Sequence, residues 1–202
     1  MVVYPTRDRR AERREATRAE ILEAAWDLVR EQGLAALSLR DVAARIGMRP
    51  PSLYWYFDSK NAVYDAMFSQ GNRELLERMA SIDWPSEPRA LLREIARAFV
   101  EFSLADPARA QLLFQRTIPD FEPSAESYEL AVQVLEEGRA RLATAGLTDP
   151  AHFDLWTALV SGLAFQQLAN EPGGDRWLGL VGEAADMFAN HVFTKRSPRR
   201  KR

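Results

Sequence analysis

The side chains best suited to specific chemistry lie within residues 37–60, LSLRDVAARIGMRPPSLYWYFDSK. Apolar residues recur three and four positions apart on both sides of Gly47, which predicts two short helices joined by a tight turn. One set of side chains is expected to pack these helices against a preceding helix: Leu39, Val42, Ala43, Ile46, Leu53 and Phe57. The others are then free to point outward: Arg40, Arg49, Ser52, Tyr54, Trp55, Tyr56 and Lys60. Cations, hydroxyls and aromatic rings on a short exposed helix suit phosphate and base-edge contacts in the major groove of DNA.

Residues that would support catalysis or metal binding are scarce. The chain has no cysteine and only two histidines, His152 and His191, which are far apart in sequence. His152 with Asp154 is too small a set for a metal site. The segment 171–175, EPGGD, is typical of a turn rather than of a phosphate-binding loop. We therefore expect no enzyme activity, no metal site and no cofactor.

The composition is that of a globular protein, with 47% hydrophobic and 28% charged residues. No stretch approaches the roughly 20 apolar residues that cross a bilayer, and the first residues are too polar for a signal peptide. The absence of cysteine agrees with a reducing compartment. We expect a cytoplasmic protein with no membrane contact.

The net charge of −2 is unevenly distributed along the chain. Residues 61–194 carry 10 Lys and Arg against 20 Asp and Glu, whereas residues 195–202, KRSPRRKR, carry six basic residues and no acidic one. Residues 1–60 carry 11 basic against 9 acidic residues. This distribution predicts that a polyanion is bound at the ends of the chain. It also leaves open a protein that binds DNA without sequence preference, or a basic tail that is simply solvated.

Nearly every segment has helical periodicity and no alternating strand pattern is present, so the predicted fold class is all-α. Residues 1–16 are expected to form a mobile basic arm, with Thr17 and Glu20 as the capping box of the first helix. Further helices are expected at about 38–46, 51–57, 59–79, 88–104, 107–117, 124–145, 150–170 and 174–193, with the best internal break at 81–88. We expect a three-helix N-terminal domain at 1–66, a larger helical domain at 67–194 and a disordered basic tail at 195–202.

The run from Gly47 and Met48 through Pro-Ser-Leu-Tyr-Trp-Tyr-Phe to Lys60 resembles the recognition helix of the TetR family of transcriptional regulators. The resemblance covers about residues 17–67 and implies a DNA-binding helix-turn-helix at 38–57. The resemblance implies that Arg40 contacts a base edge or phosphate. It implies that Pro51 and Ser52 contact a thymine methyl and a phosphate or base. It further implies that Tyr54 and Trp55 pack on the sugar-phosphate backbone and that Lys60 binds phosphate.

Three positions depart from the family pattern, and all lie on the predicted reading surface. Tyr56 stands where His is frequent, and Arg49, followed by Pro50, stands where Ser or Thr is common. We expect Pro51 to be the first helical residue and Pro50 its cap, which would hold Arg49 extended and leave the first amides free for phosphate.

The resemblance also implies that the C-terminal domain serves dimerisation and ligand binding. Residues 150–170 and 174–193 are expected to form the homodimer surface, so that two copies read a palindromic operator. A pocket for a small-molecule effector is expected in the middle helices, with Arg116 or Gln166 supplying polarity. Its expected aromatic lining is Phe99, Phe102, Phe114, Phe121, Tyr128, Trp156 and Phe165. The implied function is a ligand-responsive repressor, with an activator and a helical interaction protein as alternatives.

Overall fold

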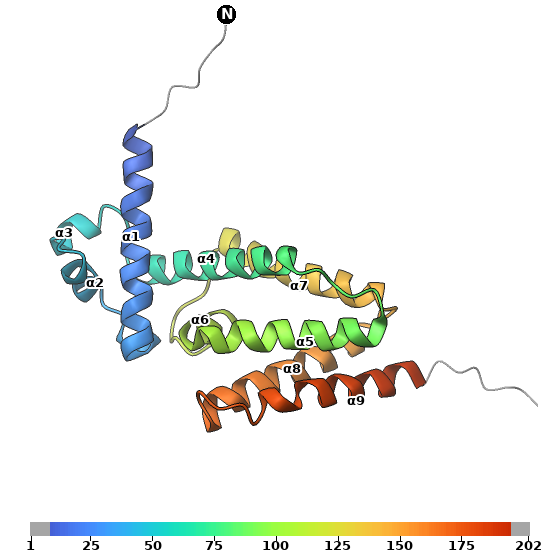
Figure 1. Cartoon of the computed structure of the whole chain (residues 1–202). Coiled ribbons are helices and arrows are strands. Elements are labelled where there is room, and N and C mark those ends of the chain that lie inside the picture. Colours follow the sequence, from blue (N-terminus) through green and yellow to red (C-terminus); the bar gives the residue numbers. More distant parts are fainter. Residues whose placement is uncertain (1–8, 195–202) are drawn as a thin grey trace, which may run out of the picture.

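The computed structural model describes residues 9–194, which form helices and connecting segments without a strand (Figure 1). The predicted all-α fold class is therefore confirmed, whereas the predicted tail at 195–202 and residues 1–8 of the predicted arm lie outside the described residues. In chain order the helices are α1 (Arg9–Gln32), α2 (Leu39–Arg45), α3 (Pro50–Leu53), α4 (Lys60–Ser81), α5 (Pro88–Ala105), α6 (Pro107–Phe114), α7 (Ala125–Thr144), α8 (Pro150–Asn170) and α9 (Val181–Thr194). Short 3-10 turns, η1 (Leu34–Ala36) and η2 (Leu178–Leu180), precede α2 and α9.

Most helices begin at residues whose side chains satisfy the free amides of the first turn. Ser59 accepts a hydrogen bond from the Ala62 amide at 3.1 Å, and Asp106 accepts one from the Arg109 amide at 3.1 Å. Proline occupies the start of α3, α5, α6 and α8, where a missing N–H costs nothing. Gly33, with φ of +85°, ends α1 in a conformation that other residues resist.

Two apolar cores lie at opposite ends of the molecule. The first is formed by α1–α4 with Ala108 and Leu112 of α6, and the second by α5, α7, α8 and α9. In Figure 1, α1 stands across one end beside α2 and α3, while α8 and α9 form the face opposite α4. The helix α4 runs unbroken past residue 66, so it joins the two ends as one rigid element. None of the helices within residues 9–194 has the length and apolar character needed to cross a bilayer.

The start of α1 differs from the sequence prediction. The helix begins at Arg9, so residues 9–16 are helical rather than part of a mobile arm. Thr17 lies inside the helix, where its hydroxyl donates to the Arg13 carbonyl at 3.0 Å instead of capping the first turn. The physical reason is that residues 9–32 contain no proline or glycine and are rich in Ala, Glu and Arg, which favour helix throughout.

The last helix also differs, because α9 begins at Val181 rather than at residue 174. The buried amide of Gln167, 1% exposed, holds the preceding loop in place. Its Oε1 accepts hydrogen bonds from the Trp177 amide at 2.8 Å and the Leu178 amide at 3.2 Å. Because these bonds use backbone groups that a helix would need, the segment stays a loop up to η2.

Tyr64 of α4 joins the first core to η1 and has a predictable effect on stability. Its side chain is fully buried, its hydroxyl donates to the Leu34 carbonyl, and burial raises the pKa of this phenol to about 12. We expect Tyr64→Phe to destabilise the protein by about 1–3 kcal/mol below pH 10, because a buried carbonyl loses its donor. From pH 10 to 12 the unfolded chain releases the phenol proton while the folded chain retains it, so the parent loses stability. The difference in the free energy of unfolding between parent and variant therefore becomes smaller.

Urea unfolding of both proteins at several pH values between 8 and 12 measures this difference in the free energy of unfolding. Tyr128→Phe is the matched control, since the Tyr128 side chain is 56% exposed. A gap between parent and Tyr64→Phe that stays constant across this range would contradict the assignment.

Candidate functional site

The predicted reading surface is built on α2 and α3. The Ser38 side chain caps α2, and Gly47, with φ of +67°, makes the turn between the two helices. The side chains of Leu39, Val42, Ala43, Leu53 and Phe57 are buried, as their spacing predicts, and Ile46 is half-buried. This apolar set packs α2 and α3 against α1 and turns the polar residues of the segment outward.

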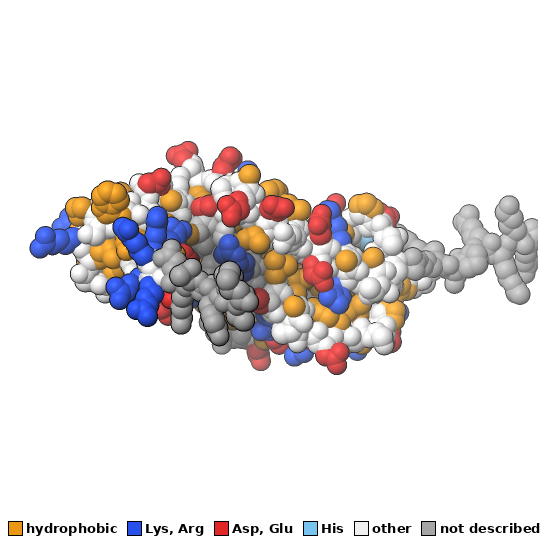
Figure 2. All heavy atoms as spheres, turned by 90° about the horizontal axis from the view of Figure 1, so that it is seen from above, with side chains coloured by type: hydrophobic (Ala, Val, Ile, Leu, Met, Phe, Trp, Pro, Cys, Tyr) orange, Lys and Arg blue, Asp and Glu red, His pale blue; other side chains and the backbone are white. Residues whose placement is uncertain are grey.

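The outward side chains form a continuous exposed set. Those exposed are Arg40, Arg49, Pro50, Pro51, Ser52, Tyr54 and Trp55. The Tyr54 side chain is 53% exposed and that of Trp55 is 82% exposed. Aromatic rings of this size seldom stand in solvent without a partner surface. Figure 2 shows Lys and Arg side chains beside hydrophobic ones at this end of the molecule.

The start of α3 corrects the predicted cap by one residue. Arg49 is the N-cap, extended at φ −74° and ψ 135° as expected, and Pro50 rather than Pro51 is the first helical residue. The expectation that free amides at this end bind phosphate is wrong. Pro50 and Pro51 have no N–H, and the Ser52 amide already donates to the Arg49 carbonyl at 2.8 Å. The helix is also shorter than expected, because it ends at Leu53.

Tyr56 and Lys60 are less accessible than the other predicted contacts. Both are half-buried. The Tyr56 carbonyl accepts a hydrogen bond from Arg18 Nη1 at 2.7 Å, and the Arg18 guanidinium lies 4.3 Å from the centre of the Phe57 ring. Lys60 Nζ donates to the Ala35 carbonyl at 3.1 Å. These contacts hold the helix-turn-helix against α1 and η1 and compete with phosphate for the Lys60 ammonium.

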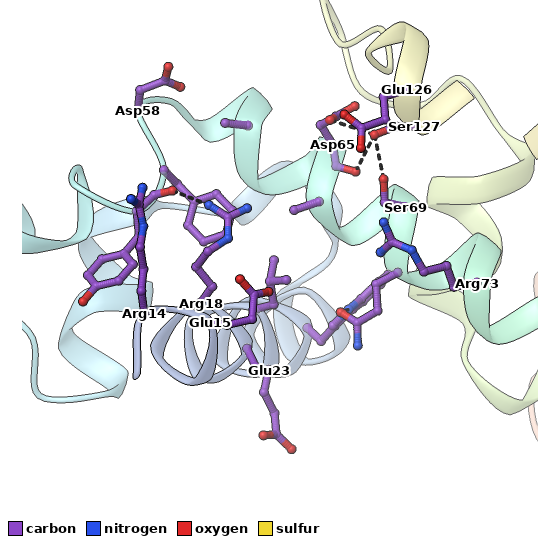
Figure 3. A pocket seen from close by; sticks show the side chains of 18 of the residues that line it. Arg14, Glu15, Arg18, Glu23, Asp58, Asp65, Ser69, Arg73, Glu126 and Ser127 are labelled. Carbon is purple, nitrogen blue, oxygen red and sulfur yellow. Dashed lines mark hydrogen bonds between the residues drawn. The ribbon is translucent and has the colours of Figure 1, made fainter. Parts of the chain in front are cut away.

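Two hollows flank this surface. One, of about 750 Å³, lies between the N-terminal turns of α1 and residues 49–57, here called the recognition segment. It is lined by Arg10, Ala11, Arg13, Arg14, Thr17, Ser52, Trp55 and Tyr56. The second, of about 1010 Å³, is a polar cleft between α1 and α4. On its α4 wall, Asp65 accepts a hydrogen bond from the Ser127 hydroxyl at 2.8 Å, which Figure 3 shows, and another from the Ser124 amide at 2.7 Å. The predicted mobile arm already contained the arginines of α1, but such an arm has no fixed position, so their location beside Trp55 was not predicted.

An apolar cavity of about 260 Å³ lies among α4, α5, α7 and α8. Of the predicted pocket residues, Phe99, Phe114 and Trp156 line it, and the Phe99 and Phe114 ring centres are 5.1 Å apart. The sequence prediction missed two hydroxyl side chains one turn apart on α8, those of Thr157 and Ser161. It also missed Trp84, whose indole N–H donates to the Met79 carbonyl at 3.0 Å.

The other predicted pocket residues lie elsewhere. Arg116, Phe121 and Tyr128 border a separate hollow of about 330 Å³, which shares only Phe114 with the cavity. Phe102 is buried beneath the Arg109 guanidinium at 4.0 Å, and Phe165 and Gln166 are outside the lining of the cavity. Helical spacing alone does not distinguish these faces, because each of the helices concerned also packs against neighbours.

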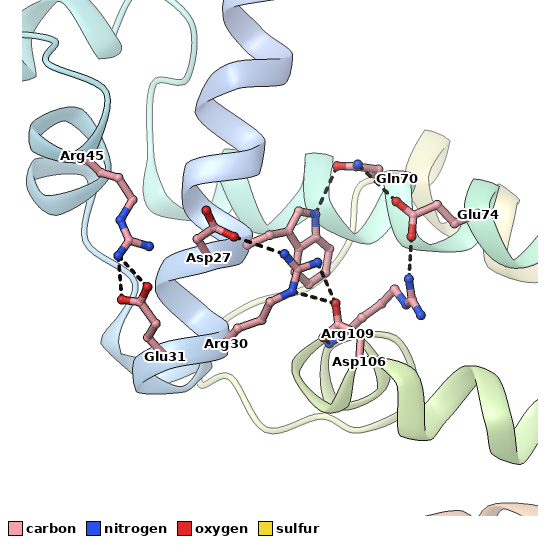
Figure 4. A network of polar contacts seen from close by, with 9 residues as sticks. Asp27, Arg30, Glu31, Arg45, Gln70, Glu74, Asp106 and Arg109 are labelled. Atoms are coloured by element: carbon pink, nitrogen blue, oxygen red, sulfur yellow. Dashed lines mark hydrogen bonds and ion pairs between the residues drawn. The ribbon is translucent and has the colours of Figure 1, made fainter.

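A polar network joins α1 to α4 and α6 (Figure 4). Arg30 of α1 donates from Nε and Nη2 to one oxygen of Asp106, at 2.9 and 2.8 Å, and Asp106 also caps α6. The Asp106 residue is 6% exposed, whereas the Arg30 side chain is 47% exposed, so only the carboxylate side of the pair is shielded from water. A second chain of contacts runs from the Trp26 indole through Gln70 and Glu74 to Arg109 of α6. α1 is thereby connected to α4 and α6.

Residues 21–67 match the family described as bacterial regulatory proteins, tetR family. The tetracycline repressor protein class A from transposon 1721 of Escherichia coli is 36% identical over 89 residues, which is 42% of this chain and 39% of that protein. An HTH-type transcriptional repressor of Mycobacterium tuberculosis is 26% identical over 162 residues, 79% of this chain and 59% of that protein. The chain thus spans about half the length of these curated relatives.

Similarity over nearly the whole described fold comes from a solved structure. A transcriptional regulator of the TetR/AcrR family from Thermobifida fusca superimposes with a TM-score of 0.62 at 26% identity, covering 88% of this chain and 98% of that chain. The family match falls on the helix-turn-helix, and the structural match extends through the helical C-terminal part. Residues 21–67 therefore match the tetR family of bacterial regulatory proteins, and the described fold as a whole is similar to that of a TetR/AcrR-family regulator.

Proposed function

We propose that this chain is a ligand-responsive transcriptional repressor that binds a palindromic DNA operator as a homodimer and is released by a small-molecule effector. The observation that carries the proposal is the exposed set on α2 and α3, in which Tyr54 and Trp55 stand in solvent beside Arg40 and Arg49. Guanidinium groups bond to base edges and phosphates, and exposed rings pack on the sugar-phosphate backbone. The curated relatives named above are repressors, which supports regulation rather than catalysis.

The surface of α8 and α9 supports a homodimer. Three large apolar side chains are exposed there: Leu155 on α8, Leu180 at η2 and Met187 on α9, at 53%, 41% and 61%. Ala158 and Gly162 are exposed on α8 and small enough for close helix approach. A twofold contact would bury these side chains in a four-helix interface. It would also present two copies of α3 to two half-sites.

The apolar cavity supports an effector that is neutral and largely aromatic. Its only charged lining residue, Arg78, is paired with Glu101 at 3.0 Å, so no free charge is available to a buried ion. The Thr157 and Ser161 hydroxyls can bond to one polar group of such a ligand. Burying an unpaired carboxylate in the same space would be strongly unfavourable.

Release from DNA requires that the effector bind one arrangement of the domains more tightly than the other. The helix α4 contributes Leu75, Arg78 and Met79 to the cavity, and its first residue, Lys60, contacts η1. A ligand that tilts α4 would therefore move η1, which leads directly into the helix-turn-helix. The Arg30–Asp106 pair gives a second connection, through α6 to α1.

The first test is selection of random duplexes by the purified protein at physiological salt. We expect one palindrome to be enriched, with half-sites about 34–36 Å apart or at multiples of one turn. Arg40→Ala and Tyr54→Ala should each weaken binding by about 1–3 kcal/mol, because contacts to base edges and backbone are lost. Arg139→Ala, which removes an exposed arginine of α7, is the matched control and should bind as the parent does. Equal retention of all sequences by all four proteins would overturn the proposal.

The second test concerns the effector. We expect 2-naphthol to bind the cavity and weaken operator binding, and 2-naphthoate to do so at least tenfold less well, because only the second carries a charge. Ser161→Leu should abolish the response to 2-naphthol by filling the cavity, whereas Gln133→Leu, on the exposed face of α7, should not. Fluorescence anisotropy of labelled operator measures release. Equal effects of the two compounds, or a full response in Ser161→Leu, would contradict the assignment.

A further inference from the structure

The N-terminal part of α1 extends beyond the core of its domain. The first buried residue of α1 is Ile21, and none of residues 9–20 is buried. In Figure 1 this part of α1 projects past α2 and α3. A helical segment of this length seldom persists without packing unless its sequence favours helix or a partner binds it.

The exposed part of α1 has one basic face. Arg10, Arg13, Arg14 and Thr17 lie three and four positions apart, and the same spacing continues into the buried Ile21. These side chains therefore lie on the face of α1 that packs on the helix-turn-helix further along. By the same periodicity Glu12 and Glu15 fall on other sides of the helix, while Glu20 lies two turns further along, at the edge of the basic face.

This basic face is directed toward the recognition segment. Arg10, Arg13 and Arg14 share the walls of one groove with Ser52 and the exposed ring of Trp55. Within residues 9–194, neither the Arg13 nor the Arg14 guanidinium makes an ion pair or a hydrogen bond. The bond from Arg18 to the Tyr56 carbonyl, at 2.7 Å, fixes α1 relative to the groove. The groove is therefore held by a direct contact between α1 and Tyr56, and its wall carries the unpaired guanidinium groups of Arg13 and Arg14.

We propose that the first three turns of α1 form a second DNA-binding element, which binds backbone phosphates of the duplex whose major groove receives α3. The proposal rests on the function proposed above and adds to it a contact outside the helix-turn-helix. Arg14 and Arg10 lie about 10 and 16 Å along the axis from Ile21, at 1.5 Å per residue. The major groove is about 12 Å wide, so arginines at this reach meet the phosphates along its edge.

The chemistry of the groove favours a polyanion over a small ligand. The groove is open, and its cations stand in a row along a helix rather than around one point. A row of guanidinium groups beside an exposed indole matches successive phosphates and sugars of one strand. The rigid helix holds these groups in position before binding, which reduces the entropy lost when they meet the duplex.

The test compares the salt dependence of operator binding for the parent and a triple variant, Arg10→Gln, Arg13→Gln and Arg14→Gln. Glutamine retains helix propensity, and circular dichroism checks that the fold is kept. The matched control removes three exposed arginines of the C-terminal part: Arg73→Gln, Arg139→Gln and Arg176→Gln. The operator is the palindrome that the parent selects, and hydroxyl-radical footprints are recorded on it for all three proteins.

We expect the triple variant to prefer the same palindrome with a smaller slope of log affinity against log salt. At about 0.9 per phosphate contact, three arginines in each of two protomers change the slope by up to about 5. Backbone protection at the groove edges should also disappear, while the control keeps the parent's slope and footprint. A triple variant with the parent's slope and footprint would overturn the inference and leave the proposed function intact. Failure of the parent to select any palindrome would instead overturn the proposed function.

Discussion

The burial of one face of α1 is the contact on which the helix-turn-helix end of the molecule depends. Ile21, Ala25 and Val29 are at most 1% exposed and pack in the core that α2, α3 and α4 share. With seven and four residues, α2 and α3 are too short to be stable alone, so this core holds them in place. Because Leu53 and Phe57 are drawn into it, Tyr54 and Trp55 are turned outward.

The helix α4 is shared by the two ends of the molecule. Its first half contributes Val63, Tyr64 and Met67 to the first core, and its second half lines the apolar cavity. An uninterrupted helix of 22 residues transmits a tilt over its whole length, about 33 Å. The Arg30–Asp106 pair adds a contact between α1 and α6, with the Asp106 carboxylate buried and the Arg30 side chain partly exposed.

Arginine plays different roles at the two ends. In the C-terminal part half of the guanidinium groups have an acidic partner, as in Arg93 with Asp186 at 2.6 Å and Arg97 with Glu94 at 2.7 Å. In the described part of the chain, Arg40 and Arg49 have none. Unpaired cations therefore stand on the exposed face of the helix-turn-helix, although the whole chain has a net charge of −2.

The sequence by itself determined the all-helical class, the helix-turn-helix and its buried set, because these follow from local spacing, Gly47 and the caps. It did not determine which face of a long helix meets which neighbour. For that reason the predicted pocket residues lie on different faces of their helices. Phe99, Phe114 and Trp156 line the cavity, whereas Phe102 and Arg116 do not. Tertiary contacts alone decided that Lys60 bonds to Ala35 and that Gln167 holds the loop before α9. Such bonds join residues 10 to 25 positions apart, and their formation depends on how whole helices pack rather than on any local pattern.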